Sequence, residues 1–166
     1  MIIVVQDANI LIDLYEADLL ASFFSLGFDN HTTDLVLYEV EQPIHKYVKD
    51  GRICQHVLTP EQLEQALRIQ TTTGRGISLP DCSVLWLSSE LGKNVRLLTG
   101  DAKLRQCAKE KGFIVHGLLW VLDQLVAKKI IPAKKMAIKL EELLHKGSRL
   151  PSEECRKRIL KWKKTP

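Results

Sequence analysis

The stretch MIIVVQDANILIDL, residues 1–14, decides the fold that this sequence predicts. Residues 2–5 form a continuous run of β-branched and aliphatic side chains, which is typical of a strand buried on both faces of a parallel sheet. The run ends at Gln6 and Asp7. Open α/β sheets bind their ligands in the crevice beyond the carboxyl ends of the strands. Asp7 is therefore the first candidate for a functional residue.

The length of 166 residues fits one domain with its own core, and 45% hydrophobic and 27% charged residues are ordinary for a globular protein. No apolar run approaches the roughly 18 residues that a membrane span needs, and no basic leader precedes the first strand. We therefore expect a cytoplasmic protein with no membrane association. The four cysteines form no C-x-x-C pair, which favours reduced, mostly buried thiols over disulfides or zinc ligands.

Positive charge is concentrated toward the C-terminus. Residues 128–166 hold 13 Lys and Arg against four Glu, a net charge of +9, whereas residues 1–127 hold 11 basic and 16 acidic residues, a net charge of −5. A basic segment on an acidic body can contact the phosphates of a polyanion. The alternative is an ordinary solvated helix surface.

Short apolar runs alternate with helical patterns along the chain. Strands are expected at residues 2–5, 32–37, 52–58, 95–98 and 113–116. Helices are expected at residues 8–26, 38–49, 60–70, 78–91, 102–111, 118–129, 133–146 and 152–162, with a loop at residues 71–76. Strands separated by helices predict an α/β fold with a mainly parallel, doubly wound sheet.

Two acidic residues follow expected strands directly. Asp7 and Asp101 each end an aliphatic strand and precede a helix, so a parallel sheet places both at its carboxyl edge. Asp81, at a helix start, and Glu39, which begins the helix expected at residues 38–49, could converge on the same edge.

Helix capping is the commoner explanation for any one of these acids, because Asp is a preferred N-cap and acidic side chains suit the positive end of a helix. Capping explains a convergent group of four less well. Four carboxylates would repel each other and raise one another's pKa unless a divalent cation neutralised them. Oxygen ligands without His or Cys suit Mg²⁺ or Mn²⁺.

The ordered set of acidic blocks resembles the PIN-domain ribonucleases, most closely the VapC-like toxins of toxin-antitoxin pairs. The resemblance covers residues 2–120, and the segments GLLWVLDQLVAKKIIP and LPSEECRKRIL are similar to a subgroup with a helical C-terminal extension. The blocks are DANILIDL with Asp7, LVLYEVEQ with Glu39, ISLPDCSVLWLSSELG with Asp81, and VRLLTGDAKLRQCAKEKGF with Asp101.

This resemblance implies a three-layer Rossmann-like PIN fold, with a mainly parallel central sheet flanked by helices, plus C-terminal helices. It implies a PIN nuclease domain at residues 1–127 and a basic helical extension at residues 128–166 packed on the same domain. The activity implied is that of a Mg²⁺- or Mn²⁺-dependent endoribonuclease, a hydrolase of RNA phosphodiester bonds. The partners implied by the resemblance are an RNA substrate, an antitoxin protein and a second copy of the chain in a homodimer.

The resemblance also implies roles for single residues. Carried over by position, the catalytic and metal-holding residues are Asp7, Glu39, Asp81 and Asp101, and the polar residues Asn9 and Thr99 match positions that orient carboxylates or water. Many members carry further acids where this chain has Gly100 and Lys103, so the number of metal ions stays open.

Basic and histidine side chains complete the set of candidates. Arg75, Lys103 and Arg105 lie near the expected site as candidate RNA contacts, although exposed basic residues are the norm on any surface. The histidines have no metal-ligand spacing and are expected to be structural, namely His31, His45, His56, His116 and His145.

Two rival classes remain. A haloacid-dehalogenase-like phosphatase needs a strand that ends in D-x-D, whereas this chain has Asp7-Ala8-Asn9 and lacks the general acid. The other rival is a catalytically impaired PIN-like module that binds RNA or protein, with the +9 segment on phosphates. The four retained acids favour the enzyme, and an RNA cleavage assay with and without EDTA separates the two.

Overall fold

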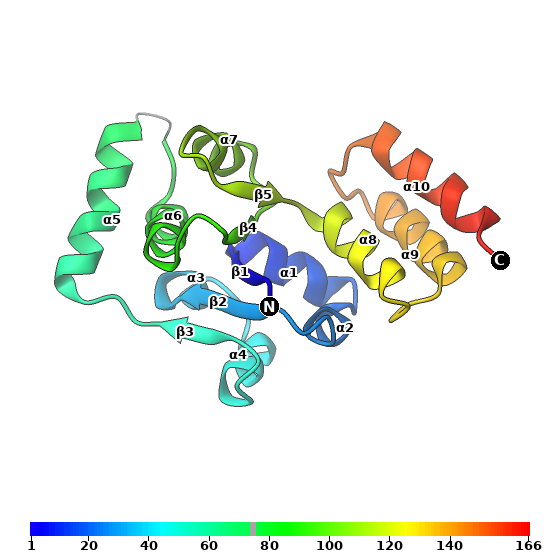
Figure 1. Ribbon diagram of the computed structural model, residues 1–166, viewed down its shortest axis with the longest axis horizontal. Helices are drawn as coiled ribbons and strands as arrows, with labels where there is room; N and C mark the ends of the chain where they lie inside the picture. The colour runs from blue at the N-terminus through cyan, green and yellow to red at the C-terminus, as the bar shows by residue number, and fades with distance from the viewer. Residues whose placement is uncertain (74–75) are drawn as a thin grey trace.

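Strands and helices alternate along the chain (Figure 1), and the computed structural model describes residues 1–73 and 76–166. The strands are β1 (Ile3–Gln6), β2 (Asp29–Thr33), β3 (Cys54–His56), β4 (Arg96–Leu98) and β5 (Ile114–His116). The helices are α1 (Ala8–Glu16), α2 (Leu20–Phe24), α3 (Asp34–Tyr38), α4 (Gln42–Lys49), α5 (Pro60–Thr73), α6 (Leu79–Leu91), α7 (Ala102–Glu110), α8 (Leu118–Ala127), α9 (Ala133–His145) and α10 (Ser152–Lys164).

The five strands form one parallel sheet in the order β3-β2-β1-β4-β5. The first strand of the chain is therefore the central one, as its apolar run predicts. Val4 and Val5 have no exposed surface, which shows that both faces of β1 are covered. The register pairs Gln6 with Leu98, so the residues that follow β1 and β4 lie side by side at one edge of the sheet.

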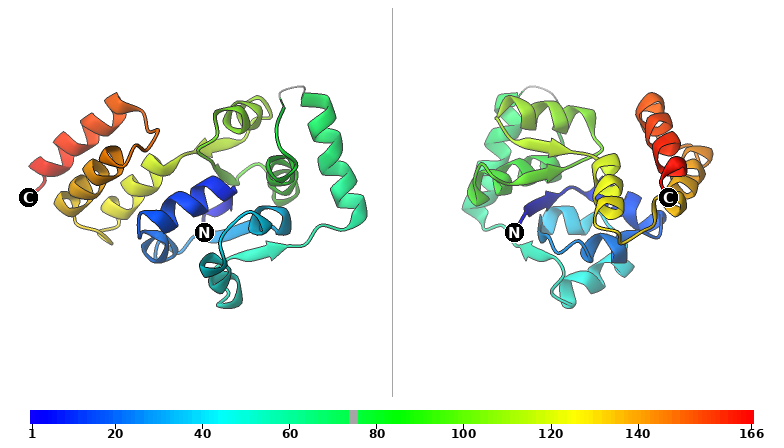
Figure 2. Two further views of the ribbon diagram at one scale, coloured as in Figure 1. Left: turned by 180° about the vertical axis from the view of Figure 1, so that it is seen from behind. Right: turned by 45° about the vertical axis from the view of Figure 1, so that its right-hand side comes forward.

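Helices cover both faces of the sheet (Figure 2). The chain runs from β1 through β2 to β3 at one edge, then crosses back to β4 and β5 at the other. Because parallel connections of this kind are right-handed, α1 and α4 lie on one face and α5 to α7 on the other. α6 contacts β1, β2 and β4, and α8 returns to contact α1 and α2. The three-layer α/β fold predicted from the sequence is confirmed.

The last two helices pack against each other beside α8, on the side of the molecule away from β3 (Figure 1). Arg158 of α10 forms an ion pair with Asp123 of α8, with 2.8 Å between Nη2 and Oδ2. Met136, Leu140 and Trp162 are buried between these helices and the rest of the chain. Among the described residues, no helix is both long and apolar enough to cross a membrane.

The local signals for helix ends are mostly correct. Thr59 and Gln62 form the reciprocal hydrogen bonds of a capping box at the start of α5, at 3.0 and 3.2 Å. The helix expected at residues 8–26 is nevertheless interrupted, because Asp18 takes a left-handed conformation with φ 56° between α1 and α2. Residues 71–73 of the expected loop belong to α5, which continues through Thr73, and residues 74 and 75 lie outside the described part of the chain.

The prediction that Glu39 begins a helix is wrong. The hydroxyl of Thr33 accepts a hydrogen bond from the Val36 N–H at 3.2 Å, which ends β2 and starts α3 earlier than the β-branched pattern at residues 32–37 indicates. Glu39 then lies at the C-terminal end of α3 rather than at the start of a helix, and Pro43 in the first turn begins α4. The helix dipole therefore does not stabilise the Glu39 carboxylate.

Candidate active site

Asp7 lies immediately beyond the central strand and is 1% exposed. Its backbone N–H donates to the carbonyl of Leu98 at 3.2 Å, which holds it against β4. Its Oδ1 accepts the N–H of Ile10 at 2.8 Å, so Asp7 is also the N-cap of α1. Capping uses only one of the two carboxylate oxygens of Asp7, so it leaves the position of the second oxygen unexplained.

Thr99 links the second carboxylate oxygen of Asp7 to Asp101, the acid that follows β4. Its buried hydroxyl donates to Asp7 Oδ2 and accepts the backbone N–H of Asp101 at 2.9 Å. Asp101 caps α7 through Oδ1, which accepts the N–H of Leu104 at 2.8 Å. The pairing of β1 with β4 thus brings both acids to one carboxyl edge, with a threonine hydroxyl between them.

Asp81 and Glu39 approach this edge from two other elements. Asp81 is half-buried in the first turn of α6, where its N–H donates to Ser78 Oγ at 3.2 Å. Glu39 is exposed at the end of α3. The negative charges interact in a chain, because Asp7 is repelled by Asp81 and Asp101, and Asp81 is repelled by Asp101 and Glu39.

Burial and repulsion make the ionised site unfavourable by itself. The pKa of Asp7 is raised to about 7, first by burial and also by the charges of Asp81 and Asp101, although the hydrogen bonds from Thr99 and Ile10 lower it. The pKa of Asp81 is also raised, first by burial and then by Asp101 and Glu39. Two carboxylic acids whose pKa values are raised by burial and by neighbouring negative charges mark a place where a cation would bind.

The donor atoms fit a hard divalent cation. All four side chains offer carboxylate oxygens, the ligands that Mg²⁺ and Mn²⁺ prefer. Among residues 1–73 and 76–166, no three of these carboxylates bring oxygens within 4.8 Å of one another. Mg²⁺ usually binds through one or two carboxylates and keeps several waters, so this wider spacing suits it.

A hollow of about 420 Å³ opens beside the acids, lined by Asn9, Asp13, Gly100, Ala102, Arg105, Leu118 and residues 148–151. Asn9 is exposed there on α1, one helical turn before Asp13. The hollow also receives Arg149 from the segment between α9 and α10. It combines polar, acidic and basic side chains next to the two strand-end acids.

Sequence reasoning missed Asp13. The residue is half-buried, and its pKa is raised by burial and by Glu16. One Asp13 oxygen would lie 3.8 Å from a Cβ placed on Gly100, so Asp13 faces the loop that carries Asp101. The spacing of four residues from Asn9 was the signal that could have found it, because such residues share one helix face.

The candidate RNA contacts have different surroundings. The guanidinium of Arg105 donates to the carbonyl of Thr99 at 3.0 Å and lies against Gly117, where a Cβ would approach Nη2 to 2.7 Å. Arg105 is therefore held in place beside the acids. Lys103 is exposed on α7, and Arg75 lies outside the described residues.

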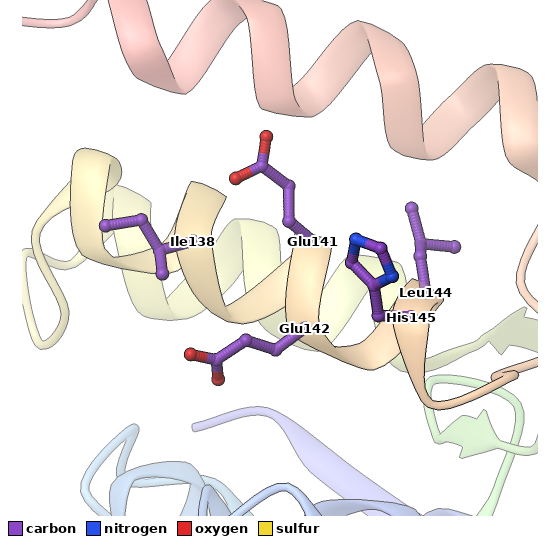
Figure 3. A pocket seen from close by; sticks show the side chains of 5 residues that line it. All are labelled: Ile138, Glu141, Glu142, Leu144 and His145. Atoms are coloured by element: carbon purple, nitrogen blue, oxygen red, sulfur yellow. The ribbon is translucent and has the colours of Figure 1, made fainter.

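A larger hollow, of about 620 Å³, lies on α9 and is unrelated to the acids. Figure 3 shows its side chains spread along an open helix face, with Glu141 directed toward α10 and Glu142 directed away. Glu141 is engaged by Lys163 of α10. The side chains do not converge on a common point, so this hollow offers no catalytic arrangement.

Comparison with known proteins places the chain in a family. A family model described as a PIN domain matches residues 3–164, which is nearly the whole chain, including α9 and α10. No curated protein matches the chain.

Proposed function

This chain belongs to the PIN-domain family, and we propose that within the family it acts as a Mg²⁺- or Mn²⁺-dependent endoribonuclease. PIN domains are generally nucleases that act on RNA and typically use divalent metals, so membership supports a nuclease-type hydrolase. The observation that supports this activity is the group of acids at the carboxyl edge, where Asp7 is repelled by Asp81 and Asp101, Asp81 is repelled by Glu39, and the pKa of Asp7 is raised to about 7.

In this proposal Asp7 and Asp101 hold the ion, and Glu39 and Asp81 complete its surroundings. When bound, the ion supplies positive charge that offsets the carboxylates and the charge developing on a phosphate. Thr99 fixes the orientation of Asp7 through its hydroxyl, which also accepts the N–H of Asp101. Hydrogen bonds of this kind, from residues behind the metal ligands, orient ligating carboxylates.

Hydrolysis consumes one water, forms one P–O bond and breaks the P–O bond to the leaving ribose oxygen. A general base must take the proton of the attacking water, and its best pKa lies near the working pH. Asp81 suits this role, because it is half-buried and its pKa is raised. The accepted proton then returns to the leaving oxygen or to solvent.

RNA needs favourable contacts to approach an acidic edge. Arg105 and Arg149 line the hollow beside the acids and supply positive charge for phosphates. Tyr38, which is 92% exposed and precedes Glu39, offers an aromatic face on which a base could stack. The +9 charge of residues 128–166 adds attraction over a longer range.

The test is cleavage of labelled RNA by the purified chain with Mg²⁺, with Mn²⁺ and with EDTA. We expect metal-dependent cleavage that Asp7→Asn and Asp101→Asn abolish and that Asp50→Asn, an exposed acid at the end of α4, leaves unchanged. Cleavage at the parent rate by Asp7→Asn, or cleavage that resists EDTA, would overturn the proposal. RNA binding without any cleavage would favour the catalytically impaired binding module.

We further propose that the chain is a VapC-like toxin that pairs with an antitoxin and forms a homodimer. The resemblance of the four acidic blocks supports this. Induced expression should then arrest growth, and Asp7→Asn should relieve the arrest. A short protein encoded in the adjacent reading frame should bind the chain and restore growth. Growth unaffected by the parent chain would favour a nuclease outside toxin-antitoxin pairs.

A further inference from the structure

A second group of metal-ligand side chains lies at the β3 edge of the sheet. His31 of β2 is paired with Cys54 of β3, and Thr33 is paired with His56. Because side chains alternate along a strand, His31, Cys54 and His56 point to the same face of the sheet. These residues belong to none of the elements that carry the four acids, except that β2 leads into α3.

The three side chains converge. His31 Nδ1 lies 2.9 Å from His56 Nε2, and His56 Nε2 lies 3.7 Å from Cys54 Sγ. One ligand atom from each residue falls within 4.8 Å of both others. Zn–N bonds of about 2.0–2.1 Å and Zn–S bonds of about 2.3 Å place tetrahedral ligand atoms roughly 3.3–3.6 Å apart. The observed separations lie on either side of this range.

Asp29 adds the partner that zinc-binding histidines usually have. Its Oδ2 lies 3.0 Å from His31 Nε2, the ring nitrogen that faces away from His56. His31 Nε2 is buried and, within the described residues, has no aligned hydrogen bond. The Asp29 side chain is 46% exposed and can rotate into alignment. A carboxylate at Nε2 keeps the proton there and leaves the Nδ1 lone pair for a metal.

We propose that His31, Cys54 and His56 bind one Zn²⁺ ion, with Asp29 as a positioning residue for His31. The N₂S donor set suits this borderline-soft cation rather than Mg²⁺. Cys54 is the exposed thiol among the four free cysteines, which leaves a fourth coordination position open to water. Binding would displace the thiol proton of Cys54 to solvent.

The ion would join an edge strand to its neighbour. β3 pairs with β2 over three residue pairs and forms one end of the sheet. The sequence predicts that the histidines are structural and that the cysteines bind no zinc, because His31 and Cys54 are too far apart in the chain to form a recognisable motif. Strand pairing brings them together. The site stands independently of the proposed nuclease activity.

The experiment is a Zn²⁺ titration of the reduced, EDTA-treated and dialysed chain, with Co²⁺ as a spectroscopic substitute. We expect one Zn²⁺ per chain and a thiolate-to-Co²⁺ charge-transfer band that Cys54→Ser removes. Asp29→Asn should weaken Zn²⁺ binding by about 10- to 100-fold. His145→Gln, an exposed histidine on α9, is the matched control and should bind as the parent does.

Because Cys54 is exposed, Cys54→Ser should leave the metal-free fold unchanged, which a thermal melt checks. Absence of binding at micromolar Zn²⁺ would overturn the proposal, as would equal binding by Cys54→Ser and the parent. Mg²⁺-dependent RNA cleavage is measured on the same variants. Because Cys54→Ser and Asp29→Asn leave the four acids intact, the two proposals can fail separately.

Discussion

The hydroxyl of Thr99 donates a hydrogen bond to Oδ2 of Asp7, 92 positions away in the chain. The contact exists because β1 and β4 are neighbours, with Gln6 paired to Leu98. The same hydroxyl accepts the N–H of Asp101, so one side chain orients both strand-end acids. The orientation of the candidate active site therefore depends on Thr99.

Thr99→Val should lower RNA cleavage by about 10- to 100-fold, as is typical when a residue that orients metal ligands is lost. It should also cost about 1–3 kcal/mol of unfolding free energy, because the Asp101 N–H and the buried Asp7 Oδ2 lose their partner. Thr99→Ser keeps the hydroxyl and is the control. Single-turnover cleavage and urea unfolding measure both effects, and equal activity of the two variants would contradict the role.

Asp7→Asn should stabilise the metal-free protein at alkaline pH while abolishing cleavage. The native pKa of about 7 exceeds the ordinary value of 3.8, so the folded chain binds more protons between these pH values. The stability that protonated Asp7 contributes is fully present below pH 3.8 and is lost as pH rises through about 7. At pH 8 the variant should gain up to about 4 kcal/mol.

Urea unfolding in EDTA at pH 5 and pH 8 measures this difference. The parent should lose stability between the two pH values, and Asp7→Asn should lose less, because its side chain does not titrate. Parallel pH profiles for both proteins would show that Asp7 is ionised normally in the folded chain.

If Mg²⁺ binds the four acids as proposed, it should raise the Tm of the parent chain by mass action, because the acids are dispersed in the unfolded chain. An ion at ten times its dissociation constant contributes about 1.4 kcal/mol, or roughly 3–6 °C for a chain of this size. Asp101→Asn should reduce this shift, and Cys54→Ser should not. Thermal melts in millimolar MgCl₂ test it, and equal shifts in parent and Asp101→Asn would place Mg²⁺ elsewhere.

Gly117→Ala should displace the guanidinium of Arg105, because the new Cβ would lie 2.7 Å from Nη2. The long Arg105 side chain can move, so the cost should be about 1 kcal/mol, that of the hydrogen bond to Thr99. Cleavage should fall if Arg105 contacts RNA. In the Arg105→Ala background the same substitution should have almost no effect. Additive effects would show that Gly117 does not act through Arg105.

Tyr38→Ala should raise the KM for RNA with little change in kcat, since stacking on an aromatic ring contributes about 1–3 kcal/mol per base. The ring is 92% exposed, so unfolding free energy should change by less than about 0.5 kcal/mol. Tyr15→Ala on α1 is the control. An unchanged KM would show that Tyr38 does not contact the RNA.

Local patterns predicted most of the fold, because they report interactions between residues near each other in the chain. The apolar run of β1, the capping box of Thr59 and Gln62, and the helix at Asp81 are confirmed. Where two local preferences compete, the prediction failed. The cap formed by Thr33 ended β2 early and moved Glu39 to the end of α3.

The sequence by itself determined the parallel sheet, the central position of Asp7 and the candidate acids, since a strand buried on both faces and an acid at its end leave a local pattern. Only the tertiary structure decided which side chains meet. Strand pairing placed Thr99 between Asp7 and Asp101, and joined His31 to Cys54 and His56. Such contacts depend on strand order and register, which are set by packing the whole core rather than by neighbouring residues.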